Sequence, residues 1–200
     1  MVQGRESLNF IEAEIQAEIE TVSIAISKNI NSWYEQNFQG LETLALKLSE
    51  SPELEQTEAL ALIKNALPAF MKIDVINNQG IMVDAYPTTN QLGETLKVIN
   101  ISDMISLEKL ATTKQTQITE VKTDKAGSIP HIGVQVPMFN PSNNSLIGAV
   151  YGSLELSTLS QLIDIQLKEF ALQTILLDKN NHVITDSLQN LNTMDECRAR

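Results

Sequence analysis

A helical pattern over residues 5–50 constrains the fold of this chain more than any other feature. Its apolar residues recur at steps of four, four and three, a period of about 3.67 residues per turn that keeps one stripe aligned on a nearly straight helix. No proline interrupts the pattern, and at 1.5 Å per residue the helix would be roughly 65 Å long. We expect it to pack along a domain and extend beyond it; a helical hairpin inside a bundle is the alternative. The stripe consists of Ile11, Ile15, Ile19, Val22, Ile26, Ile30, Trp33, Leu41, Leu44 and Leu48, with Asn37 at its one polar position.

After this helix the sequence changes to shorter elements. Ser51 can cap a second helix that begins near Pro52 and ends at about Leu67. Asn77-Asn78-Gln79-Gly80 separates two β-branched runs and predicts a hairpin turn. The predicted elements that follow are strands at 72–76 and 81–86, an irregular stretch at 92–100, a helix at 102–112 capped by Ser102 or Asp103, strands at 115–122, 131–139 and 146–155, and a helix at 157–170 capped by Ser157.

The order of these elements predicts an α+β fold. Strands joined by hairpins form one antiparallel sheet, here of five strands, with the long helix on one face and the linker of residues 88–115 on the other. Residues 176–186 repeat the hairpin of residues 75–85 at an offset of 101 (176 minus 75), which indicates a second copy of the unit unless the similarity is due to chance. We therefore expect the two N-terminal helices in residues 1–67, a first lobe in 68–170 and the start of a truncated second lobe in 171–200.

Charge and composition exclude several classes of function. Fourteen Lys and Arg against 25 Asp and Glu give a net charge of −11, which argues against nucleic-acid binding and against docking on anionic lipid. The single cysteine, Cys197, allows no internal disulfide and no cysteine-rich zinc site. The sequence contains no apolar run long enough to span a bilayer, and its N-terminus lacks a signal-peptide pattern.

Alternation along two strands places small and polar side chains on one sheet face, as a small-molecule pocket requires. In residues 131–139 the positions between the apolar ones carry a glycine and two polar side chains, and residues 146–155 have a similar face. The alternative is a solvated sheet face with half-buried tyrosines. We predict a ligand pocket lined by Tyr86, His131, Gln135, Tyr151 and Ser153.

Four segments, in this order, resemble the Cache family of PAS-like extracytoplasmic sensor domains in its double-Cache form. They are the long N-terminal helix, the hairpin IDVINNQGIMVDAYP, the segment PHIGVQVPMFNPSNNSLIGAVYGSLELSTLSQLI and the second hairpin ILLDKNNHVITDS. The resemblance covers roughly residues 5–187. It implies a PAS-like lobe that holds a ligand, followed by the start of a second PAS-like lobe.

The resemblance also implies the periplasmic or extracellular part of an inner-membrane receptor, bracketed by two transmembrane helices that these 200 residues lack. A sensor histidine kinase is the favoured output module, and a chemoreceptor or a diguanylate cyclase is the alternative. The implied partners are a small molecule of unknown class and a second copy that pairs through the long helix. Family members that bind amino acids use aromatic and Arg side chains around the sheet, with an Asp in the last strand that holds the ligand's ammonium. This chain has no arginine between Arg5 and Arg198, and Ser153 holds the Asp position, which puts an α-amino acid in doubt.

Two other classes of function remain as alternatives. A structural or adaptor protein would assemble through the long helix and bind no small molecule, but it would gain stability by filling the polar sheet face. An enzyme is disfavoured because no nucleophile, phosphate or metal motif occurs. Asp74 and Asp84 lie on adjacent strands and could approach each other, yet no general acid accompanies them. We predict no catalytic residue, no cofactor and no metal site.

Overall fold

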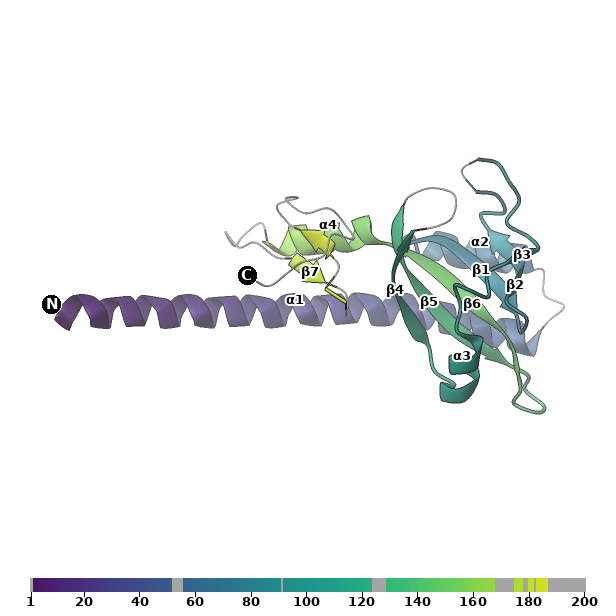
Figure 1. Ribbon diagram of the computed structural model, residues 1–200, viewed down its shortest axis with the longest axis horizontal. Helices are drawn as coiled ribbons and strands as arrows, with labels where there is room; N and C mark the ends of the chain where they lie inside the picture. Colours follow the sequence, from purple (N-terminus) through teal and green to yellow (C-terminus); the bar gives the residue numbers. More distant parts are fainter. Residues whose placement is uncertain are drawn as a thin grey trace. The chain divides into compact units, whose positions relative to one another are not determined.

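The predicted long helix is confirmed. The structure is a computed structural model that describes residues 2–51, 56–90, 92–123, 129–167, 175–177, 180–181 and 183–186. Helix α1 (Val2–Glu50) runs without a break for 49 residues (Figure 1). The chain divides within this helix into two units, residues 1–36 and residues 37–200. The second unit contains the sheet, and its part of α1 contributes four buried apolar side chains, Leu41, Leu44, Ala45 and Leu48.

An antiparallel sheet with the strand order β3-β2-β1-β6-β5-β4 forms the centre of the second unit (Figure 1). The predicted hairpin and the three longer strands are confirmed, but the sheet has six strands where the sequence predicts five. The additional strand, β3, is two residues long and lies in the stretch expected to be irregular. Backbone hydrogen bonds from Ile101 N to Gly80 O and from Val98 N to Met82 O hold it at the edge. The strands are β1 (Phe70–Asn77), β2 (Ile81–Tyr86), β3 (Ile99–Asn100), β4 (Gln117–Thr123), β5 (Pro130–Phe139) and β6 (Leu146–Glu155).

The C-terminal turns of α1 and helix α2 (Gln56–Ala66) cover one face of the sheet. Close approach of the layers requires a glycine in β6, because a Cβ on Gly152 would lie 2.7 Å from side-chain atoms of both Leu41 and Phe70. Val150 and Leu154, two residues to either side, are fully buried on this face. Burial of each such side chain contributes about 1.5–3 kcal/mol, so this layer is the main apolar core.

The linker, residues 88–115, covers the opposite face, as predicted. It contains helix α3 (Leu107–Thr113) and packs apolar side chains against the central strands. This second core surrounds Tyr151 and is closed to solvent. Its buried members are Ile76, Met82, Ala85, Leu96, Ile101, Ile105, Leu110, Ala149 and Tyr151.

Helix α3 begins later than the sequence predicts. Residues 102–104 form a turn, so neither Ser102 nor Asp103 caps the helix, and Ser106 is the N-cap residue. The cause is tertiary, because the side chain of Gln135 on β5 binds the backbone of Met104 and of Ser106. These bonds hold the segment in a non-helical conformation.

Helix α4 (Leu156–Leu167) follows β6 directly and begins one residue before the cap that the sequence predicts. The hydroxyl of Ser157 donates instead to Glu155 Oε1 at 2.6 Å. Leu156 is already buried, which fixes the start of the helix at the end of the strand. The end of the predicted helix, residues 168–170, lies outside the described residues.

The second hairpin repeats the first in its pairing as well as in its sequence. Val75 pairs with Asp84 in β1–β2, and Leu176 pairs with Thr185 between β7 (Ile175–Leu177) and β8 (Val183–Asp186). Each hairpin has a register shift directly after the first residue of that pair. The left-handed residues of the two turns, Gly80 with φ 79° and Asn181 with φ 65°, also differ by 101 positions. The common register favours a repeated unit over chance similarity.

Candidate functional site

A row of buried polar side chains crosses the centre of the sheet on the linker side. Asp74 of β1 pairs with Tyr151 of β6, and Tyr151 pairs with Gln135 of β5. Partners in an antiparallel ladder point to the same face, so these three side chains share one. All are at most 3% exposed. A row of this kind at the bottom of a second core is the strongest candidate for a ligand site in the described part of the chain.

Four of the five predicted pocket residues lie on this face, and one does not. His131, Gln135, Tyr151 and Ser153 are all buried on the linker side. Tyr86 pairs with Ile73 and therefore lies on the opposite face. The cause is a β-bulge at Val83, which inserts one residue into β2 and reverses the facing of the residues that follow it.

The same bulge separates the two carboxylates that the sequence places on adjacent strands. Without it Asp74 would pair with Asp84, but in the structure Asp74 pairs with Ala85 and Asp84 pairs with Val75. The two carboxylates therefore point to opposite faces of the sheet. The close approach of Asp74 and Asp84 that the sequence suggests therefore does not occur.

Gly133 leaves space on this face of the sheet, as the sequence suggests, but the side chain of Tyr151 occupies it. A Cβ at this position would lie 2.2 Å from the hydroxyl oxygen of Tyr151. The Tyr151 ring therefore leans across β5. Burial raises the pKa of the Tyr151 phenol, and the nearby charge of Asp74 raises it further. The phenol is consequently a neutral hydrogen-bonding group at neutral pH.

Gln135 fastens the linker to the sheet. Its amide nitrogen donates to the carbonyl of Met104 at 3.1 Å, and its oxygen accepts from the backbone N–H of Ser106 at 3.3 Å. Lys122 Nζ donates to the same Met104 carbonyl at 3.2 Å. Three hydrogen bonds thus hold the linker segment that closes over Tyr151.

The sequence analysis missed Lys72 and Asp74 as members of this site. Asp74 is fully buried, and its Oδ2 lies 3.0 Å from Nζ of Lys72, whose side chain is 26% exposed. Burial raises the pKa of Asp74 to about 6, although the charge of Lys72 and its hydrogen bond act in the opposite direction. The signal in the sequence was a pair of charges at alternate positions of an otherwise apolar central strand.

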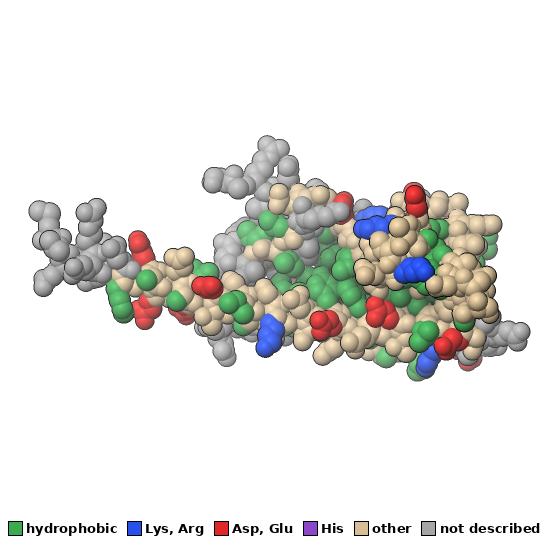
Figure 2. Space-filling model, turned by 90° about the horizontal axis from the view of Figure 1, so that it is seen from below, with side chains coloured by type: hydrophobic (Ala, Val, Ile, Leu, Met, Phe, Trp, Pro, Cys, Tyr) green, Lys and Arg blue, Asp and Glu red, His purple; other side chains and the backbone are tan. Residues whose placement is uncertain are grey.

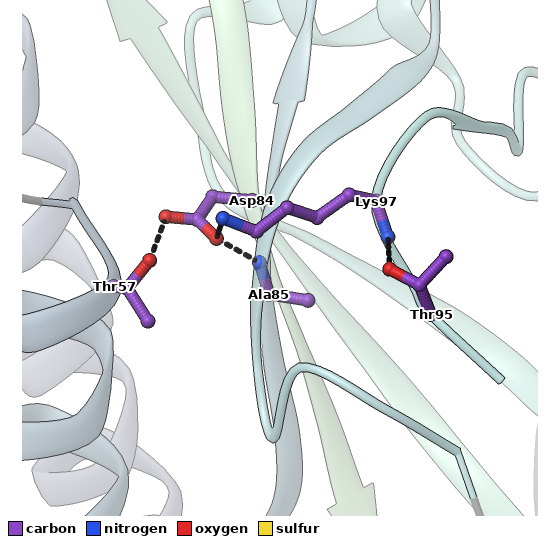
Figure 3. A network of polar contacts seen from close by, with 5 residues as sticks. All are labelled: Thr57, Asp84, Ala85, Thr95 and Lys97. Atoms are coloured by element: carbon purple, nitrogen blue, oxygen red, sulfur yellow. Dashed lines mark hydrogen bonds and ion pairs between the residues drawn. The ribbon is translucent and has the colours of Figure 1, made fainter. Parts of the chain in front are cut away.

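A second polar network links the linker to helix α2 on the other face (Figure 3). Asp84 accepts from Thr57 Oγ1 at 2.6 Å and from the Ala85 N–H at 2.9 Å, and it pairs with Lys97 Nζ at 2.9 Å. Burial acts to raise the pKa of Asp84, but these hydrogen bonds and the Lys97 charge outweigh it, so the pKa lies below its ordinary value. The ionised side chain of Asp84 therefore links α2, β2 and the linker.

We expect Thr57→Val to lower the free energy of unfolding by about 2 kcal/mol, because a hydrogen bond to a charged acceptor contributes about 1.5–3 kcal/mol. Urea unfolding of the wild type and the variant measures this difference. Thr43→Val is the matched control, since the Thr43 hydroxyl bonds to its own helix at an exposed position. Equal losses in both variants would contradict a special role for the Asp84 network.

The described surface also has two hollows, of about 720 Å³ and about 400 Å³. The larger one lies between residues 42–50 of α1 and the strand ends near Phe139, and the smaller one lies beside α4. None of the five predicted pocket residues lines either hollow. Among the described residues no group of three His, Cys, Asp or Glu side chains could hold a metal ion.

No protein-family model matches the chain, and no curated protein matches it. Solved structures do match. An extracellular ligand-binding receptor from Desulfohalobium retbaense is 17% identical over 82% of this chain and 30% of its own, with a TM-score of 0.71. The ligand-binding domain of the Pseudomonas aeruginosa amino acid chemoreceptor PctB with L-Gln is 18% identical over 82% and 65%, with a TM-score of 0.64. The ligand-binding domain of the Campylobacter jejuni chemoreceptor Tlp3 with 4-methylisoleucine is 12% identical over 83% and 67%, with a TM-score of 0.65.

These matches confirm at the level of the fold the resemblance to Cache sensor domains. The chain has an α+β, PAS-like Cache fold, and the similar structures are an extracellular ligand-binding receptor and ligand-binding domains of chemoreceptors. The chain spans less than two thirds of the length of the first two. Among its described helices, none has an apolar stretch sufficient to cross a membrane.

Proposed function

We propose that this chain is the ligand-sensing part of a transmembrane receptor and that a small molecule binds between the linker and the sheet. The observation that supports this most strongly is the row of buried polar groups, Asp74, Tyr151 and Gln135, because one of them, Gln135, holds the covering linker through two hydrogen bonds. We leave Tyr86 out of the proposed pocket because its side chain lies on the other face of the sheet, and we keep His131 and Ser153 in it.

The proposed signal is a change in the position of the linker. A ligand can shift an equilibrium between two arrangements only if it binds one of them better. Opening of the linker would break the bonds of Gln135 to Met104 and Ser106, and Lys97 would carry the movement to Asp84 and so to α2 (Figure 3). The hydrogen bond from Thr57 to Asp84 would thus connect the linker, which covers the proposed ligand site, with helix α2 on the other face of the sheet.

The whole receptor would present this part outside the inner membrane and carry an output module on the other side. A histidine kinase is our first choice, and a chemoreceptor or a diguanylate cyclase is the alternative. We also propose that two copies pair through α1. Phe10, Ile11, Ile15 and Ile19 are each at least 44% exposed, and red acidic side chains flank the described part of this helix (Figure 2).

A scaffold that binds no small molecule is the second candidate. One observation favours it, namely that Ile101, Ile105 and Leu110 of the linker already fill the space above Tyr151. A scaffold would keep this arrangement permanently, whereas a sensor would open it.

Thermal unfolding against a panel of amino acids, organic acids, amines and purines tests the sensor function. We expect one chemical class to raise the midpoint, because a ligand at a hundredfold excess over its Kd stabilises the native state by about 2.7 kcal/mol. The shift should be lost in Gln135→Ala and kept in Gln161→Ala, an exposed position on α4. A midpoint that rises with protein concentration supports the pairing of two copies. A flat panel for a folded chain would favour the scaffold.

A further inference from the structure

The C-terminal end of the linker contacts α1 as well as the sheet. Thr116 Oγ1 donates to Glu42 Oε1 of α1 at 2.6 Å, although the two residues lie 74 positions apart in the sequence. The ammonium of Lys114 lies 5.8 Å from the centre of the Phe139 ring, at the end of β5. We call residues 113–116 the junction, because this segment connects the linker with both α1 and the sheet.

Lys114 has a backbone conformation that its residue type disfavours. It ends α3 in the left-handed region, with φ 55°, and its N–H donates to the Leu110 carbonyl at 3.0 Å. Glycine or asparagine is the usual residue at such a position, because a longer side chain is strained there. The Lys114 side chain offsets this strain through its cation–π contact with Phe139, which glycine could not make. A residue that opposes a local rule and makes such a contact is a candidate for a functional role.

Side-chain hydrogen bonds fix the shape of the junction. Gln117 Nε2 donates to Thr113 Oγ1 and to the Gln115 carbonyl, each at 3.2 Å. The Gln115 N–H donates to Thr113 Oγ1 at 3.4 Å. A movement of the end of α3 therefore displaces Thr116 with it.

Helix α3 connects the junction with the part of the linker that Gln135 holds. The helix begins after Ser106, whose N–H donates to Gln135 Oε1, and it ends at Lys114. Between these two ends, Leu110 is fully buried in the second core, which surrounds Tyr151. Seven residues of helix form a rigid element about 10 Å long. Displacement of Ser106 or Leu110 therefore moves the junction as well.

The contact between the junction and α1 can break without disturbing the core. The hydrogen bond from Thr116 to Glu42 is exposed, so water can replace either partner. Both residues also line the hollow of about 720 Å³, which leaves space beside them. The contacts of Asp84 differ in both respects, because Asp84 is buried and its bond with Thr57 leads to α2.

We propose that α3 couples the ligand site directly to α1, and that opening of the linker breaks the hydrogen bond from Thr116 to Glu42. This inference rests on the proposed function, because it names the route by which that site acts on the long helix. Coupling is reciprocal, so loss of the contact favours the open linker as much as opening favours loss of the contact. The signal then reaches α1 without passing through α2.

Hydrogen exchange followed by mass spectrometry tests the coupling without any ligand. Gln135→Ala loosens the linker, and we expect amide exchange to become at least threefold faster in residues 42–50 of α1 as well as in residues 105–113. In a Thr116→Val background the same substitution should leave residues 42–50 unchanged, because the connection is absent. Thr116→Ser keeps the hydroxyl and should behave as the wild type. Thr112→Val is the matched control, since that hydroxyl bonds within α3, and it should leave the coupling intact.

Reciprocity gives a second expected result, namely faster exchange of residues 105–113 in Thr116→Val with Gln135 intact. The coupling is overturned by a Gln135→Ala variant that leaves exchange in α1 unchanged, or whose effect on α1 persists in the Thr116→Val background. Equal acceleration in the central strands β1 and β6 would mean that the whole fold is loosened, and it would also overturn the coupling. The ligand panel is a separate measurement. A flat panel overturns the proposed function, whereas absent coupling in a chain that binds a ligand overturns this inference alone.

Discussion

Gly148→Ala is expected to produce a large loss of stability. Gly148 lies in β6, between Asn77 of β1 and Met138 of β5. A Cβ at this position would lie 2.1 Å from the carbonyl oxygen of Ile76, which is a backbone atom in the middle of the sheet. Such an atom cannot rotate away, so the two strands would have to separate. Overpacking of this kind costs about 3 kcal/mol, which corresponds to a decrease in Tm of about 8 °C.

Gly93→Ala is the matched control for this variant. Both glycines have a positive φ, 158° at Gly148 and 79° at Gly93, but no atom lies within 4 Å of the Cβ position of Gly93. Its substitution therefore carries the backbone cost alone, about 1 kcal/mol. Differential scanning calorimetry of both variants separates the two contributions. Equal decreases in Tm would show that the contact with Ile76 is not the cause.

Elements defined by local periodicity could be predicted from the sequence. The eleven-residue stripe of α1, the alternation in β5 and the turn at residues 77–80 each depend on residues close together in the chain. The later start of α3 could not be predicted, because the Gln135 side chain that prevents the helix at Met104 is 31 residues away in sequence. Long-range hydrogen bonds of this kind leave no local pattern.

In the candidate site, too, some features follow from local sequence patterns and others do not. Alternation correctly groups Gln135 with His131 and Tyr151 with Ser153, since each pair lies on one strand. The facing of Tyr86 depends on the bulge at Val83, which one extra residue in β2 creates. The sequence analysis considered Asp74 only as a possible partner of Asp84 and not as part of the pocket, although a charge in a central strand is unfavourable to folding. The residues that oppose the general pattern of a buried strand are therefore the ones to test for function.

We expect Asp74→Asn to stabilise the protein at pH 7.5 by about 2 kcal/mol. The pKa of Asp74 rises from 3.8 in the unfolded chain to about 6 in the folded protein. At 1.36 kcal/mol per pKa unit, the ionised carboxyl therefore costs about 3 kcal/mol above pH 6. Asparagine has a similar shape and no charge, so it removes this cost. The value of about 6 already includes the attraction of Lys72. The amide of asparagine is itself a buried polar group at a position without good hydrogen-bond partners among the described residues, which offsets part of the gain.

The pH dependence of the stability difference distinguishes the cost of the ionised Asp74 carboxyl from other effects of the substitution. A carboxyl with a raised pKa binds its proton more tightly in the folded state, so its cost is fully present above pH 6. The cost decreases as the pH falls through 6 and is absent below 3.8. The stability advantage of Asp74→Asn should therefore disappear between pH 7.5 and pH 4. Urea unfolding at pH 7.5, 6 and 4.5 measures it as the difference between variant and wild type.

Asp84, whose lowered pKa makes stability decrease in acid, points to the opposite face of the sheet and is present in both proteins, so its contribution cancels in this difference. The pKa of Tyr151 responds to the charge of Asp74, but burial raises it so far that the phenol is neutral in both proteins over this pH range. A variant that is less stable than the wild type at pH 7.5 would mean that Lys72 fully compensates the buried charge. Asp74 would then be half of a structural ion pair. A stabilised variant would show that the buried charge of Asp74 is retained at the expense of stability.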